Sequence, residues 1–134
     1  MASVLMCLCV VNPSITDIQR LDLIRTIKAI HMVEGSGKLS VPPGDGGASW
    51  GPLQIQMAVV VDVNTRYGTA FTSPDRLDFR KSVEICVCYL WMWEPNGNPE
   101  KWARLWNSGP SWRTKTEKTD GYWADIQALM GEPG

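Results

Sequence analysis

The segment VEGSGKLSVPPGDGGASWGPLQI, residues 33 to 55, decides the fold because it interrupts a chain whose neighbouring segments favour helix. It holds six glycines and two adjacent prolines, residues that break regular structure. It also holds two carboxylates, Glu34 and Asp45, eleven positions apart. We therefore expect a glycine-rich loop or a short hairpin that carries both acidic side chains.

A helix is expected immediately before this segment. Thr16 and Gln19 have the spacing of a capping box, and apolar residues recur every three positions from Ile18 to Val33. Glycines at 35 and 37 should stop this helix. The acidic residue at position 34 would then lie in its last turn.

More helices are expected after the segment, near residues 52–64, 73–93, 99–106 and 121–130. Ser73-Pro74 and Asn98-Pro99 are start signals for two of them, and the polar stretch RTKTEKT leads to the last. The expected fold class is mainly α. It is a helical single domain over residues 1–134 with a core at about 16–131, in which the short glycine-rich loop or hairpin forms one wall of a cleft. Residues 1–13 are either a signal remnant or a first buried segment.

Composition excludes several classes of function. Thirteen basic residues balance fourteen acidic ones, so no basic surface points to nucleic acid. No apolar run reaches the length of a transmembrane helix. Seven tryptophans are many for 134 residues, and some of them are expected to line a groove.

The four cysteines form two Cys-x-Cys pairs, at 7/9 and at 86/88. Buried free thiols are favoured over a cross-link between the two pairs. A zinc site is disfavoured because the chain has one histidine and no Cys-x-x-Cys. No metal and no cofactor are expected, and His31 is interpreted as a structural residue.

The two carboxylates lie in opposed environments. Glu34, at the carbonyl end of an apolar helix, should favour its protonated form, whereas Asp45 lies among glycines whose backbone N–H groups would stabilise its charge. Glycoside hydrolysis uses such a pair, one acid to protonate the leaving oxygen and one carboxylate to stabilise the sugar cation. A solvated Glu and a turn-forming Asp are the alternative.

Four motifs occur in one order over residues 24 to 126: VEGSG, GDGGASWGPLQI, RLWNSGP and TDGYW. In this respect the chain resembles the lysozyme-like superfamily, and most closely the invertebrate-type lysozymes. The resemblance implies that the mainly helical domain has the α+β lysozyme-like fold. The chain departs from the invertebrate-type lysozymes at EGSG, at Trp50 in place of a usual cystine position, and at Ser108 in place of a glycine. The missing cystine framework resembles bacterial or phage relatives instead.

The resemblance implies roles for individual residues. Glu34 corresponds to the general acid and Asp45 to the second catalytic carboxylate. The implied substrate-binding residues form a floor and an opposite wall: Ser49, Gln54 and Ile55, then Asn107, Ser108, Gly109, Tyr122 and Trp123. From their positions beside the motifs, Trp50, Trp112 and Trp123 are the indoles expected in the groove.

The resemblance implies a hydrolase that cleaves β-1,4 links of peptidoglycan or a related N-acetylhexosamine polymer such as chitin, with retention of configuration. The rival enzyme is a lytic transglycosylase that uses Glu34 alone. A non-catalytic wall-binding module and a wall-opening part of a virion or secretion complex are further alternatives. The substrate favours a location outside the cytoplasm, and the oligomeric state stays open.

Overall fold

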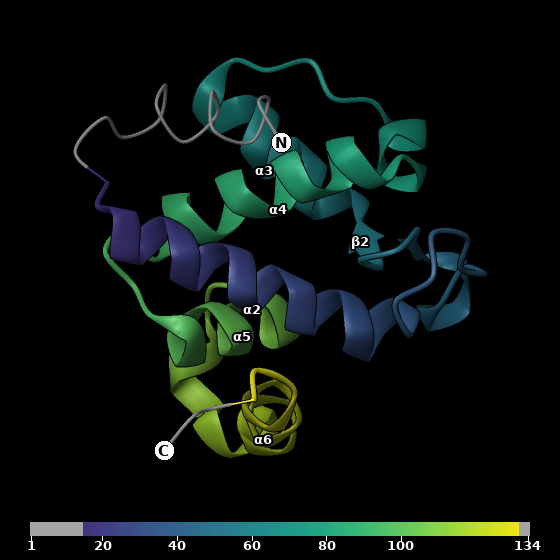
Figure 1. Cartoon of the computed structure of the whole chain (residues 1–134). Helices are drawn as coiled ribbons and strands as arrows, with labels where there is room; N and C mark the ends of the chain where they lie inside the picture. The colour runs from purple at the N-terminus through teal and green to yellow at the C-terminus, as the bar shows by residue number, and fades with distance from the viewer. Residues whose placement is uncertain (1–14, 132–134) are drawn as a thin grey trace.

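A computed structural model describes residues 15–131 of the chain (Figure 1). The expected mainly helical fold class is confirmed for these residues, which also contain one two-stranded sheet. Within the same range, no helix is both long and apolar enough to cross a membrane. The expected signal remnant or first buried segment at 1–13 lies outside the described residues, as do Cys7 and Cys9.

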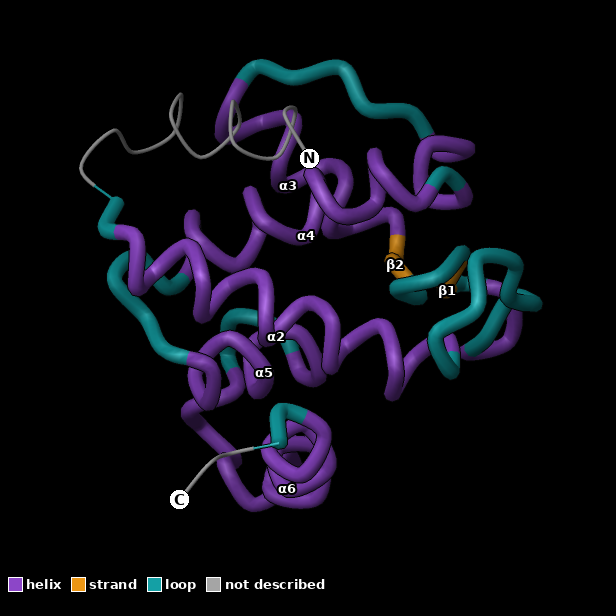
Figure 2. The backbone as a smooth tube through the Cα atoms, in the orientation of Figure 1, coloured by secondary structure: helices purple, strands orange, loops and turns teal. Residues whose placement is uncertain are grey.

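The elements follow one another along the chain with a single excursion into strand structure (Figure 2). The α-helices are α2 (Asp17–Gly35), α3 (Met57–Tyr67), α4 (Phe79–Trp93), α5 (Pro99–Ser108) and α6 (Asp120–Leu129). The 3-10 helices are η1 (Asp45–Gly47), η2 (Ser73–Leu77) and η3 (Trp112–Thr119). The strands are β1 (Ser49–Trp50) and β2 (Ile55–Gln56).

Helix α2 begins as the sequence predicts. The Thr16 hydroxyl accepts a hydrogen bond from the Gln19 backbone N–H at 3.1 Å, and the Gln19 side chain accepts one from the Thr16 N–H at 2.8 Å. The three-residue apolar spacing is a poorer guide to burial, because Ile18 is 73% exposed whereas Ile30 is fully buried. Three residues turn a helix by about 300°, so the stripe drifts around the helix with each step.

Two of the later helices begin at other residues than predicted. The helix expected from residue 52 begins at Met57, because residues 49–56 form the hairpin instead. The helix expected from Ser73 is split, since Asp78 has extended backbone and its side chain accepts from the Lys81 N–H to start α4. The Asn98 cap of α5 is confirmed, with its side chain accepting from the Lys101 N–H at 2.9 Å.

The last two elements also differ from the prediction in detail. The polar stretch before the final helix belongs to η3, a 3-10 segment with a kink inside it at Lys115. Helix α6 covers Asp120–Leu129, one residue earlier at each end than expected. Shifts of one or two residues are usual at helix ends, and the predicted order of the helices is unchanged.

Helix α4 lies at the centre of the core. An almost unbroken run from Ser82 to Trp91 is buried on it, and α2, α3 and α5 pack against it. Cys86 is a free, buried thiol on this helix, as expected, whereas Cys88 takes part in a disulfide, so the expectation of a free thiol is wrong there. Because neighbouring elements cover this run on every side, its sequence has no polar face.

The hairpin β1–β2 lies beside the C-terminal end of α2 (Figures 1 and 2). Its strands are antiparallel and pair Ser49 with Gln56 and Trp50 with Ile55. A two-stranded ribbon of this length is not stable alone, so other elements must hold it.

Arg76, at the end of η2, holds the hairpin in place. Its guanidinium is buried and donates to the carbonyl oxygens of Ile55 at 3.0 Å and Ser73 at 3.0 Å. The same group lies 4.2 Å from the centre of the Trp50 ring, a cation–π distance. One side chain therefore joins both strands to the segment that precedes α4.

Arg76→Met is expected to lower the free energy of unfolding by about 2–4 kcal/mol, because it leaves buried carbonyl oxygens without donors. Urea unfolding of the purified variant measures this loss. Arg76→Lys keeps the charge but not the forked donor geometry, so it should fall between the variant and wild type. Equal midpoints for all three proteins would show that Arg76 does not hold the hairpin.

Candidate active site

A cleft of about 530 Å³ lies between the end of α2, the hairpin, α3 and the end of α5. It brings together most of the residues that the sequence singled out. Those that line it are Glu34, Asp45, Ser49, Gln54, Ile55, Asn107, Ser108 and Gly109. Residues 34–62 and residues near 106–109, which are far apart in the sequence, thus converge on one concave surface, the usual form of a small-molecule or polymer site.

Glu34 lies in the last turn of α2, as expected, and is half-buried. The Tyr122 hydroxyl, from α6, donates a hydrogen bond to Glu34 Oε2 at 2.9 Å. Burial raises the pKa of the Glu34 carboxyl, the Tyr122 hydrogen bond opposes that rise, and the Asp45 charge adds to it. The side chain is therefore biased toward the protonated acid.

The backbone after Glu34 explains the unusual sequence EGSG. Gly35 is the last residue of α2, and Ser36 takes the left-handed conformation with φ of 53° that ends the helix. A Cβ on Gly35 would lie 2.5 Å from the Pro52 carbonyl oxygen. Because this glycine lets the helix end touch the hairpin loop, the acidic side chain before it faces the hairpin.

Asp45 lies on the exposed turn η1, where it lines the cleft, and has a positive φ of 51°. Its Oδ2 accepts a hydrogen bond from the buried Ser49 hydroxyl at 2.6 Å. The sequence predicts backbone N–H donors for this carboxylate, whereas the structure shows a side-chain hydroxyl. That bond fixes Asp45 to the strand that forms the cleft floor.

The rest of the floor comes from the hairpin. Gln54 has a positive φ of 54°, and its amide nitrogen donates to the Gly51 carbonyl at 2.9 Å. Ile55 is fully buried below it, so its contribution to the cleft is the shape of the floor. Ser49 is buried as well, so Gln54 and Asp45 are the polar groups of this wall that a ligand could contact.

The opposite wall is only partly as expected. Asn107, Ser108 and Gly109 line it from the end of α5. Tyr122 supports Glu34, and it is not among the lining residues of the cleft. Trp123 lines a separate pocket, so its placement in the cleft is wrong.

The other two expected indoles are also elsewhere. Trp50 packs on Arg76 and donates its ring N–H to the Gly47 carbonyl. Trp112 is buried, and its ring N–H donates to Glu94 at 3.2 Å. The indole that lines the cleft is Trp106, which is not among the three expected there.

Several cleft residues were missed, among them an aromatic pair and a carboxylate. Trp106 meets Tyr89 edge to face at 5.9 Å between ring centres, and both line the cleft with Asp62 of α3. Burial raises the pKa of Tyr89 to about 12, with Asp62 adding to the rise. The available signals were weak: a lone carboxylate within the apolar stretch MAVVVDVN, and a Trp directly before Asn107.

His31 lies away from the cleft. Its Nε2 is 2.7 Å from the Lys38 carbonyl oxygen, and its ring packs on Phe79 with 4.9 Å between ring centres. These contacts agree with the structural interpretation of His31. Among residues 15–131, no group of three or more His, Cys, Asp or Glu side chains could hold a metal ion.

Comparison with known proteins adds no relative. No protein-family model, curated protein or solved structure matches the chain. The case for a function therefore rests on the sequence motifs and on the geometry of the cleft.

Proposed function

We propose that this protein is a glycoside hydrolase of lysozyme type that cleaves the β-1,4 links of peptidoglycan, with Glu34 as its general acid. One observation carries the proposal: Glu34 is half-buried, has a raised pKa, accepts a hydrogen bond from Tyr122 and lines a cleft of about 530 Å³. A catalytic acid needs a pKa near the working pH and a fixed position at the bond it protonates.

In the proposed reaction, Glu34 gives its proton to the oxygen that links two sugars. The bond between that oxygen and the anomeric carbon breaks, and positive charge develops on the sugar ring. Asp45 lines the same cleft, where its carboxylate would attack or stabilise that carbon. Water then completes the hydrolysis, with Glu34 acting as the base that receives its proton.

The lining of the cleft suits an N-acetylated sugar chain. Trp106 is half-buried and offers aromatic surface on which a sugar ring can stack, with the buried Tyr89 ring packed edge to face against it. The side-chain amide of Asn107 can donate to and accept from N-acetyl groups, whereas the Gln54 amide nitrogen already donates to the Pro42 and Gly51 carbonyls and leaves its oxygen as an acceptor. These groups favour a neutral, polar polymer as the ligand.

A lytic transglycosylase is the second candidate, and one observation favours it. Asp45 lies on an exposed turn and is already bonded to Ser49, whereas Glu34 is half-buried beside its tyrosine. An enzyme that uses one glutamate first as acid and then as base would need only the half-buried Glu34. The sugar's own hydroxyl would then close an anhydro ring in place of water.

Mass spectrometry of the products from purified peptidoglycan distinguishes the candidates. Hydrolysis yields saccharides with a free reducing end, whereas a transglycosylase yields anhydro products that are one water lighter. Wild-type protein that binds the polymer but releases neither product would instead support a non-catalytic wall-binding module.

Two substitutions should move the pH dependence of the rate in opposite directions. The Tyr122 hydrogen bond lowers the pKa of Glu34 and the Asp45 charge raises it. Tyr122→Phe should therefore shift the basic limb of the kcat/KM profile to higher pH, and Asp45→Asn should shift it to lower pH. Rates of wall hydrolysis measured from pH 4 to about 9 test both signs. A basic limb that stays in place in both variants would mean that it does not report Glu34.

A further inference from the structure

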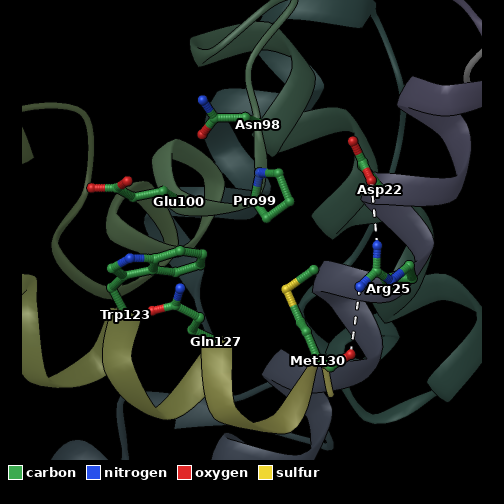
Figure 3. Close-up of a pocket in the computed structure, with 8 residues that line it drawn as sticks. All are labelled: Asp22, Arg25, Asn98, Pro99, Glu100, Trp123, Gln127 and Met130. Carbon is green, nitrogen blue, oxygen red and sulfur yellow. Dashed lines mark hydrogen bonds and ion pairs between the residues drawn. The ribbon is translucent and has the colours of Figure 1, made fainter. Parts of the chain in front are cut away.

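A second pocket, of about 350 Å³, lies where α2, the start of α5 and α6 meet (Figure 3). It shares no lining residue with the cleft. Figure 3 shows Trp123 and Gln127 projecting from α6 toward Asn98, Pro99 and Glu100. Asp22 and Arg25 of α2 and Met130 complete the lining.

The polar groups of this pocket are arranged for a neutral ligand. Asp22 pairs with Arg25 at 3.8 Å, and Glu100 pairs with Arg104 at 3.1 Å. Arg104 also pairs with Asp120 at 2.7 Å, so the charged residues of the lining, Asp22, Arg25 and Glu100, keep a small excess of negative charge that disfavours an anion. Their carboxylate oxygens keep lone pairs that can accept hydrogen bonds from hydroxyl groups.

The remaining groups supply a flat apolar surface and amide donors. Trp123 is half-buried, so part of its indole is open to the pocket. The Asn98 side-chain oxygen already accepts from the Lys101 N–H, which leaves its NH₂ group as a donor. The exposed Gln127 adds a second amide one helical turn from the indole. An aromatic face bordered by amides and carboxylates matches a sugar, which has apolar C–H faces and hydroxyl edges.

We propose that this pocket is a second carbohydrate site, which binds a short stretch of N-acetylhexosamine polymer outside the cleft. The identity of the sugar rests on the proposed function, whereas the existence of a sugar site rests on the lining. Adjacent residues of α6 serve the two places, since Tyr122 contacts Glu34 and Trp123 lines the second pocket. A site here would hold the polymer on the protein while the cleft acts on another part of it.

The test is an NMR titration of the Glu34→Gln protein with the tetramer of N-acetylglucosamine, following the indole N–H signals. The Trp123 signal should shift and saturate, and the Trp106 signal reports the cleft in the same sample. Trp123→Leu should weaken binding at the second site about tenfold, as loss of a stacking ring does. Gln127→Ala, a milder change on an exposed residue, should weaken it about threefold.

Trp93→Leu is the matched control, because Trp93 is 43% exposed on α4 and lines neither site. The backbone N–H signal of Gln127 reports the second site when Trp123 is replaced. In the Trp93→Leu protein this signal should shift as in the parent protein, with the same midpoint of the sugar titration. A Trp123 signal that stays fixed while the Trp106 signal moves would overturn the second site. A Trp123 signal that moves while the Trp106 signal is fixed, together with no product from the wild-type protein, would overturn the proposed function instead and leave the second site in place.

Discussion

Gly51→Ala is expected to lower the free energy of unfolding by about 3–5 kcal/mol and to abolish activity with it. Gly51 has a φ of 83°, which an alanine adopts only under strain. An added Cβ would also lie 1.9 Å from the Arg76 carbonyl oxygen, a backbone atom that cannot turn aside. The hairpin would have to move away from η2, and the cleft floor would move with it.

Gly46→Ala is the matched control for this prediction. Gly46 lies in the same segment with a similar φ of 68°, but a Cβ there would meet nothing within 4 Å. The control should therefore cost only the backbone strain, about 1–2 kcal/mol. Urea unfolding of both variants separates strain from close approach, and equal losses would show that the contact with Arg76 is unimportant.

The helix starts show what could be predicted from the sequence. Thr16 with Gln19, and Asn98 with Pro99, are local signals, and the structure contains both caps. The convergence of Glu34 and Asp45 on one cleft was also expected, because the glycine-rich segment after the helix lets the chain fold back toward the helix end.

Side-chain direction could not be predicted in the same way. Tyr122 and Trp123 are adjacent in the motif TDGYW, but successive residues on a helix point about 100° apart. One therefore contacts Glu34 and the other lines a different pocket. Only the packing of α6 against α2 decides which residue takes which place.

Glu34→Gln is expected to lower the rate of glycan cleavage by about a hundredfold to ten-thousandfold, the usual contribution of a general acid. Glutamine keeps the size of the side chain and an oxygen that can accept the Tyr122 hydrogen bond. It has no proton to give to the leaving oxygen. The loss should therefore fall on kcat more than on KM.

The same substitution should not destabilise the fold at neutral pH. Because the pKa of Glu34 is raised on folding, the folded state binds its proton more tightly than the unfolded state does. The wild-type protein then loses stability as the pH rises from about 4.5 through the folded pKa. Glutamine never ionises, so the variant should unfold at the same or a higher urea concentration than wild type at pH 7. A lower midpoint would indicate that the charged Glu34 is stabilising.

The central claim is tested most directly by counting the reducing ends released from purified peptidoglycan by wild type, Glu34→Gln and Glu117→Gln at equal concentration. Glu117 is exposed on η3 and lines no part of the cleft, so it is a matched control for the loss of one carboxylate. We predict equal release by wild type and Glu117→Gln, and about one hundredth of it or less by Glu34→Gln. Equal release by wild type and Glu34→Gln, or no reducing ends from wild type, would contradict the account.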